Sequence, residues 1–140
     1  MGISCIAVIG KDNYPLFINT NTEADSLFIQ YNIHSALDMV QEKFAKFASA
    51  DTKDMFLGLL YPTEDHRIYG YITNTKVKFI IMVEVNSHIL IRDIEINDIF
   101  RKLHAAYVEM LFSPFYTLNT PIKSLRFKAI VTELMYNSDK

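Results

Sequence analysis

The segment that most constrains the fold is the uninterrupted apolar run Phe79-Ile80-Ile81-Met82-Val83 in the 140-residue chain. A strand with only one covered face alternates between apolar and polar residues. Because this run has no polar position, it predicts a central strand whose two faces are both covered. Helices must then lie on both sides of the sheet, which makes the chain a layered α/β protein of the α+β type.

Further strand-forming segments lie on both sides of this run in the sequence. The predicted strands are Ile3–Ile9, Tyr14–Thr20, Met55–Tyr61, Arg67–Thr73 and Val77–Val85. Turn-forming residues fill the short connections Gly10–Asn13, Pro62–Asp65 and Asn74–Thr75. Since connections this short join antiparallel neighbours, the sequence predicts a five-stranded antiparallel sheet.

Apolar residues that recur at helical spacing between Ala24 and Phe47 predict a long amphipathic first helix. Thr20 and Glu23 have the spacing of a capping box at its start. We expect its buried stripe to be Ala24, Leu27, Phe28, Tyr31, Leu37, Val40, Phe44 and Phe47.

Two more helices are predicted near the end of the chain, one capped by Asp93 and ending before Ser113-Pro114, the other capped by Ser124. The expected buried stripe of the former is Ile96, Ile99, Phe100, Leu103, Tyr107, Met110 and Leu111, and that of the latter is Phe127, Ile130, Val131 and Leu134. The element order is β-β-α-β-β-β-α-α. We therefore expect one helix on one face of the sheet and two on the other.

The length and composition of the chain exclude several classes of function. The length and the absence of repeats or linkers predict one domain, residues 1–140, and the four glycines fit no phosphate-loop or hydrolase motif. A net charge of −2 with scattered basic residues argues against nucleic-acid binding. The chain has a single cysteine, Cys5, so it cannot form an intramolecular disulfide, and we expect a reducing compartment such as the cytosol. We expect Cys5 itself to be a small residue of the hydrophobic core.

Candidate chemistry is sparse. His34 and Asp38 are four residues apart on the first predicted helix, but no nucleophile can be placed beside them. The histidines at 34, 66, 88 and 104 lie on separate elements, so no metal site is expected. Tyr69 and Tyr71 should share a half-exposed face of one strand. No catalytic residue, cofactor site or metal site is predicted, which leaves protein binding as the expected activity class.

Several short sequences, taken together, closely resemble the sedlin family of small subunits of the transport protein particle (TRAPP) complex. They are Cys5–Ile9, Asn13–Leu16, His34–Asp38, Leu57–Asp65, Tyr69–Tyr71, Lys76–Phe79, Phe100–His104 and Ser113–Tyr116. They span nearly the whole chain in the family's order.

The resemblance implies a longin-type (SNARE-like) fold and a non-catalytic subunit of a tethering complex in traffic between endoplasmic reticulum and Golgi. The implied partners are other TRAPP small and large subunits. A Rab GTPase would be engaged only through the assembled complex, which promotes nucleotide exchange. The implied location is cytoplasmic, peripheral at endoplasmic reticulum and Golgi membranes, with attachment through the complex. Self-association and a role in regulating exchange stay open.

The resemblance also suggests residues for structural or partner contacts. Asp38 is expected to hold the first helix against a neighbouring loop or a partner. Ser113, Pro114, Phe115 and Tyr116 are expected to end the second helix and to anchor the following loop. Two alternatives remain: a small chain of a clathrin-type adaptor, or a small-molecule or enzymatic cleft around Lys76, Lys78 and His104.

Overall fold

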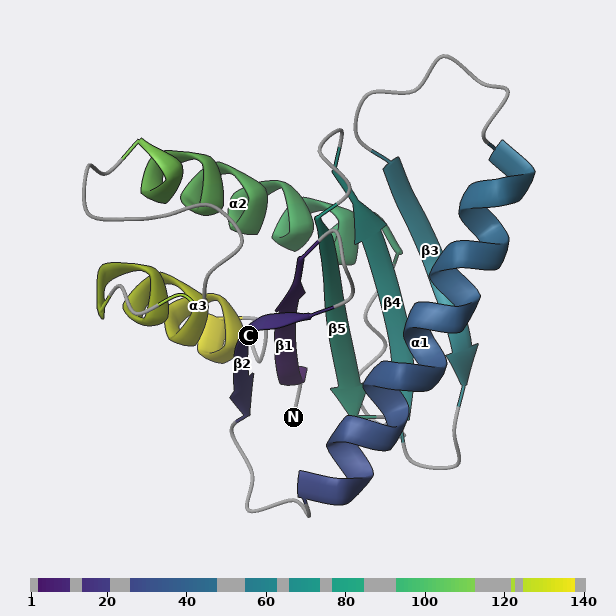
Figure 1. Ribbon diagram of the computed structural model, residues 1–140. Coiled ribbons are helices and arrows are strands. Elements are labelled where there is room, and N and C mark those ends of the chain that lie inside the picture. Colours follow the sequence, from purple (N-terminus) through teal and green to yellow (C-terminus); the bar gives the residue numbers. More distant parts are fainter. Residues whose placement is uncertain are drawn as a thin grey trace.

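A computed structural model describes residues 3–10, 14–20, 26–47, 55–62, 66–73, 77–84, 93–112, 122 and 125–137. Within these residues the elements, in chain order, are β1 (Ile3–Ile9), β2 (Pro15–Thr20), α1 (Ser26–Phe47), β3 (Met55–Pro62), β4 (His66–Ile72), β5 (Lys78–Glu84), α2 (Asp93–Leu111) and α3 (Leu125–Asn137) (Figure 1). The mixed α/β class, with an antiparallel sheet and three helices, is confirmed.

The five strands form one sheet in the order β2-β1-β5-β4-β3, with every neighbouring pair antiparallel. The apolar run Phe79–Val83 forms most of β5, the middle strand, and all five side chains are buried. α1 lies on one face of the sheet, and α2 and α3 lie on the other (Figure 1). The prediction of a central strand covered on both sides is confirmed.

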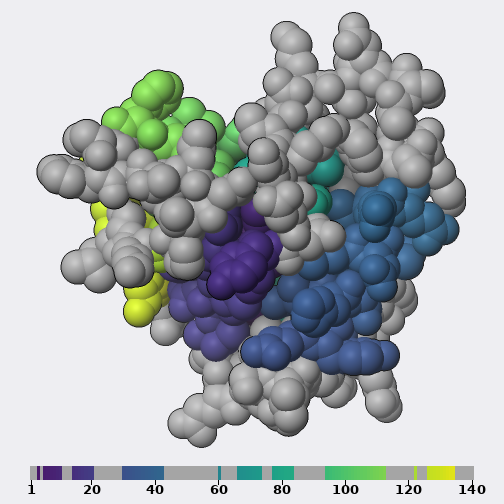
Figure 2. Space-filling view, in the orientation of Figure 1, coloured from purple at the N-terminus to yellow at the C-terminus, as the bar shows by residue number. Residues whose placement is uncertain are grey.

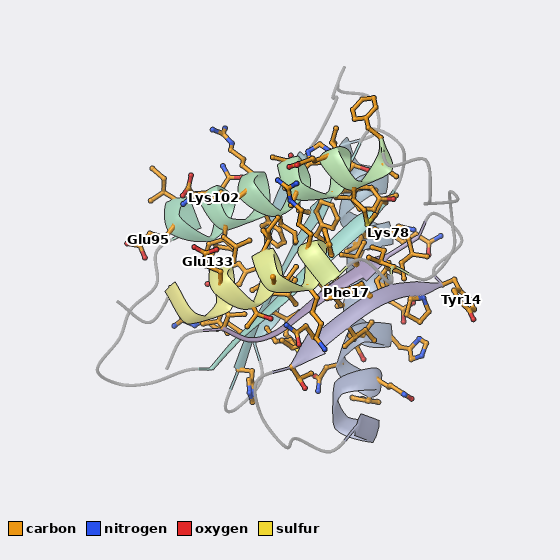
Figure 3. The ribbon with its side chains drawn as sticks, turned by 90° about the vertical axis from the view of Figure 1, so that its left-hand side faces the viewer. Tyr14, Phe17, Lys78, Glu95, Lys102 and Glu133 are labelled. Carbon is orange, nitrogen blue, oxygen red and sulfur yellow. The ribbon has the colours of Figure 1, made fainter. Side chains whose placement is uncertain are left out.

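The sheet separates two hydrophobic cores, and β5 contributes to both. Phe79, Ile81 and Val83 pack under α2 and α3, whereas Ile80 and Met82 pack under α1. The predicted stripes of α2 and α3 are buried or partly buried within the larger core. The other side of α2, including Glu95 and Lys102, is exposed (Figure 3).

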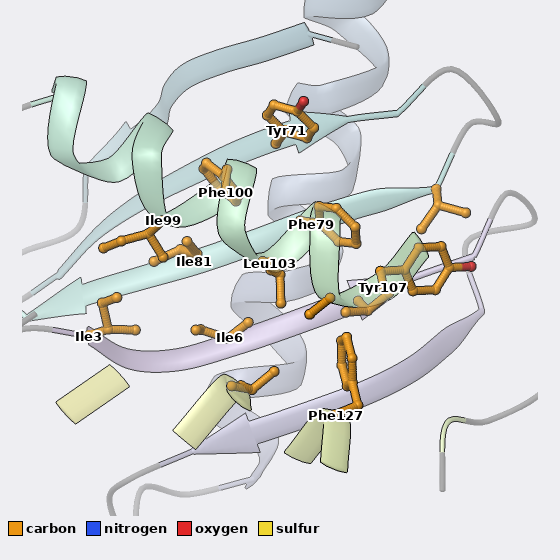
Figure 4. Packing of buried hydrophobic residues seen from close by; sticks show 14 of the residues in the cluster. Ile3, Ile6, Tyr71, Phe79, Ile81, Ile99, Phe100, Leu103, Tyr107 and Phe127 are labelled. Carbon is orange, nitrogen blue, oxygen red and sulfur yellow. The ribbon is translucent and has the colours of Figure 1, made fainter. Parts of the chain in front are cut away.

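A β-bulge near the start of β1 determines which core receives its first residue. The pairing of β1 with β5 shifts register between Ile3 and Cys5. Beyond the bulge, Ile6 alternates normally with Cys5, but Ile3 lies on the same side as Ile6, under α2 and α3 (Figure 4). The bulge therefore adds a fully buried isoleucine to the larger core.

The predicted buried stripe of α1 is wrong at Tyr31, whose side chain is 71% exposed. The sheet-facing residues include Ile33 and Ala36, which the predicted stripe omits, together with Leu37 and Val40. Tyr31 is six residues before Leu37, which places it about 120° away around an α-helix. The sequence pattern therefore combined two stripes that point in different directions.

Aromatic rings join the sheet to α2 and α3 in a continuous series (Figure 4). The centroid distances are 5.4 Å for Phe100–Tyr71, 6.0 Å for Tyr71–Phe79, 5.7 Å for Phe79–Tyr107, 6.5 Å for Tyr107–Phe127 and 5.1 Å for Phe127–Phe17. Tyr69 and Tyr71 share this face, as predicted, but both are buried rather than half-exposed. The reason is that α2 covers the face they share.

Polar contacts hold the edge strand β2 against the C-terminal part of the chain. The amide of Asn19 donates to the hydroxyl of Thr132 on α3 at 3.1 Å. The backbone N–H of Ile122 donates to the carbonyl of Leu16 at 2.8 Å. Part of the outer edge of β2 is therefore already paired within the chain, which limits its use for strand addition by a partner.

Several predicted boundaries are displaced by one residue. β4 runs from His66 to Ile72 and β5 begins at Lys78, because Thr73 and Val77 close the turn between them. The Thr73 N–H donates to the Val77 carbonyl at 2.8 Å, and the Val77 N–H donates to the Thr73 hydroxyl at 3.1 Å. α2 begins at Asp93, its predicted cap, whereas Glu23 and Ser124 lie outside the described residues.

Gly70 on β4 leaves room for the side chain of Leu60 from β3 in the core beneath α1. A Cβ atom at this position would lie 2.8 Å from Cδ1 and 3.1 Å from Cγ of buried Leu60. Gly70→Ala is therefore expected to lower the free energy of unfolding by about 1–3 kcal/mol, measured by urea denaturation. A Leu60→Ala background should shrink the penalty of Gly70→Ala; an unchanged penalty there would contradict the assigned contact.

Candidate interaction surfaces

The histidines of the described residues are dispersed, as predicted. His34 is exposed on α1, His66 is half-buried at the start of β4, and His104 is half-buried on α2. Among the described residues, no group of three or more His, Cys, Asp or Glu side chains could hold a metal ion. The same residues include no helix long and apolar enough to cross a membrane.

Of the three residues proposed to surround a cleft, Lys78 and His104 are among the described residues. The His104 ring lies 5.9 Å from the rings of both Tyr71 and Phe79. Lys78 is half-buried on β5, whereas Lys76 lies outside the described residues. His104 thus packs at the margin of the aromatic series, which gives it a structural role independent of any ligand.

Cys5 is a core residue, as predicted, with an exposed fraction of 1% beneath α1. Burial in apolar surroundings disfavours the thiolate and raises the pKa of the thiol from 9.0 to about 12.

At pH 8 we therefore expect a thiol reagent to label Cys5 slowly in the folded chain and rapidly in denaturant. Because the folded-state pKa is raised, the stability linked to this thiol is complete below about pH 9 and is lost as pH rises toward 12. Equal labelling rates with and without denaturant at pH 8 would contradict this placement.

Asp38 lies on the solvent-exposed side of α1, near His34 at the i,i−4 position and Gln41 at i+3. No hydrogen bond between the two described side chains of His34 and Asp38 is present, so the structure does not assemble them as a dyad. Figure 2 shows α1, in blue, beside β1 and β2, in purple, on one face of the molecule. Because Asp38 is exposed, its carboxylate is available to a partner that approaches α1.

Ser113, Pro114, Phe115 and Tyr116 lie outside the described residues, so their predicted role stays a prediction. The helix they were expected to end does stop just before them. α2 ends at Leu111, and Phe112 continues into a turn.

A surface that the sequence reasoning missed lies on the outer side of α2. Of the large apolar side chains exposed within the described residues, Ile94 at 71% and Val108 at 36% lie on this helix, and Phe112 at 84% directly follows its last residue. They fall outside the predicted buried stripe of α2. A search for a second apolar stripe at helical spacing could have found them.

Comparison of the sequence with known proteins identifies its family. A family model described as sedlin matches residues 8–137. The chain belongs to the sedlin family.

Relatives in the family are similar along almost their whole length. The Trafficking protein particle complex subunit 2-like protein of Xenopus tropicalis is 45% identical over 133 residues, which cover 94% of this chain and 95% of that protein. The protein of the same name from Dictyostelium discoideum is 39% identical over 137 residues, covering 95% and 96%. The similarity therefore covers at least 94% of this chain and at least 95% of each of these two relatives.

Proposed function

We propose that this sedlin-family chain is a non-catalytic subunit of a trafficking protein particle complex. The observation that carries the proposal is the 45% identity over 94% of the chain to a protein named as a subunit 2-like member of that complex. The family match favours this assignment over a small chain of a clathrin-type adaptor. Exposed apolar side chains on α2 supply surface for protein partners.

We further propose a fold class for this chain, a role for it within the complex and a location in the cell. The layered arrangement, with α1 on one face and α2 and α3 on the other, supports assignment to the longin (SNARE-like) class. We propose that the chain supports assembly of a Rab guanine-nucleotide exchange factor without contributing exchange residues. It would then lie at the cytoplasmic surface of endoplasmic reticulum and Golgi membranes, held there by the other subunits.

An exchange assay tests this division of roles. The complex would be purified with and without this chain, and the rate of nucleotide release from its Rab GTPase would be compared. We expect the isolated chain to give no acceleration, and its addition to the depleted complex to restore both assembly and exchange. Acceleration by the isolated chain would contradict the non-catalytic role.

Asp38→Ala tests the predicted partner contact on α1. Because Asp38 is exposed, we expect the free energy of unfolding to change by less than about 0.5 kcal/mol. Recovery of the other subunits with a tagged chain should fall about fivefold if the carboxylate contacts one of them. Unchanged recovery together with unchanged melting would remove Asp38 from the interface; Gln41→Ala, on the same helix, is the matched control.

A further inference from the structure

The outer surface of α2, continued by the turn residue that follows it, presents a stripe along the whole helix. It consists of Ile94, Arg101, Ala105, Val108 and Phe112, called here the outer α2 stripe. Its members follow Ile94 by 7, 11, 14 and 18 positions, each close to a whole number of 3.6-residue turns. Leu103, half a turn out of phase, is fully buried, so the stripe points directly away from the sheet.

Four of the five residues in the stripe are apolar, although all of them are exposed. Ile94 and Phe112 keep 71% and 84% of their surface; Ile94 is the second residue of α2, and Phe112 is the turn residue that directly follows its last one. Apolar positions separated by three, four and seven residues are the spacing with which one helix packs against another. The stripe therefore matches an elongated helical partner better than a compact ligand.

Among the described residues, the charges beside the stripe leave Arg101 available at its centre. Lys102 pairs with Asp98 at 3.2 Å, and Arg126 of α3 pairs with Glu109 at 2.7 Å. The guanidinium of Arg101 makes no ion pair with another described residue. A partner with a carboxylate opposite Arg101 would complement this surface and fix the register of docking.

The same charges argue against pairing with a second copy. Ile94 and Phe112 are each nine residues from Leu103. If the α2 helices of two copies paired antiparallel and centred at Leu103, each Ile94 would lie opposite the second copy's Phe112. That pairing would also bring Asp98 close to the second copy's Glu109 and the two Lys102 side chains together. Like charges in apposition disfavour the self-pair.

An anionic membrane is also a poor match. Asp98 and Glu109 border the stripe along the side nearest α3, and Glu95 lies farther around the same side. Helices that bind membrane surfaces have a polar face rich in Lys and Arg. The carboxylates here would be repelled by anionic lipid.

We propose that the outer α2 stripe binds an amphipathic helix of another subunit, with apolar side chains over Ala105 and Val108 and a carboxylate opposite Arg101. The assignment rests on the proposed function, because it takes the partner from the same complex. It identifies a contact surface distinct from α1, on the opposite side of the sheet.

Site-specific photo-cross-linking tests the occupant directly. A benzoylphenylalanine residue would replace Val108 in the tagged full-length chain, and Lys128 on the exposed side of α3 as the control. We expect position 108, far more than position 128, to cross-link to another subunit, within a helical segment that carries an acidic residue. A cross-link to a second copy or to phospholipid would overturn the proposal, as would equal yields at both positions.

A matched charge reversal tests the role of Arg101. Arg101→Glu and Lys128→Glu make the same change of charge at exposed positions on neighbouring helices. We expect only Arg101→Glu to lower recovery of the cross-linked subunit, by about tenfold, with both melting temperatures preserved. Equal recovery of both variants overturns the proposal while the proposed function stands. Recovery of the wild-type chain without any other subunit contradicts the proposed function itself, and with it this assignment.

Discussion

Phe127→Ala is expected to lower the free energy of unfolding by about 3–5 kcal/mol. Phe127 is 1% exposed and lies between Tyr107 of α2 and Phe17 of β2, with ring centroids at 6.5 and 5.1 Å. Removing the ring leaves a cavity where α3 meets both the sheet and α2. Since domains of this kind are stable by only about 5–15 kcal/mol, the loss should be evident in urea denaturation.

Phe112→Ala is the matched control for this variant. It deletes the same side chain from a position that is 84% exposed, so the free energy of unfolding should change by less than about 0.5 kcal/mol. Equal destabilisation by the two variants would contradict the assigned packing of α3. The same control variant should also weaken binding through the outer α2 stripe, which separates its effect on assembly from any effect on folding.

Ile33→Ala is expected to lower the free energy of unfolding by about 2–5 kcal/mol, because its side chain is 5% exposed in the core between α1 and the sheet. Tyr31→Ala, two residues earlier on the same helix, should change it by less than about 0.5 kcal/mol. Urea denaturation of the two variants measures which face of α1 meets the sheet. A larger effect of Tyr31→Ala would mean that the helix is rotated from the orientation described above.

The most predictable elements were those whose sequence pattern allows one arrangement. Phe79–Val83 has no polar face, so exposing either side to water would cost free energy. Burial on both sides was therefore expected, and β5 is indeed the central strand. The stripe of α2 keeps one phase from Ile96 to Met110 and is buried throughout. In both elements, local pattern and tertiary packing favour the same face.

The details that were missed depend on packing between distant residues. In α1 the apolar pattern changes phase between Tyr31 and Ile33, and only the position of the sheet decides which phase is buried. The bulge that places Ile3 beside Ile6 depends on pairing with β5, which is distant in the sequence. Neither could be read from one segment alone.

The interaction surfaces were predicted less completely than the fold. The family resemblance predicted a structural or partner contact at Asp38, and in the structure this side chain is exposed on α1. The outer α2 stripe was not predicted, because Ile94, Val108 and Phe112 fall outside the stripe that explains the core. In a helix with apolar residues on two sides, one side packs in the core, and an exposed apolar second side indicates a surface that binds a partner.

Native mass spectrometry of the assembly recovered through a tag on this chain tests the central claim most directly. The chain would be expressed at its natural level, and the intact masses of the purified species would be assigned to their component proteins. We predict an assembly in which the chain is bound to other subunits of a trafficking protein particle complex. Recovery of the chain only as a monomer or homodimer would contradict that claim.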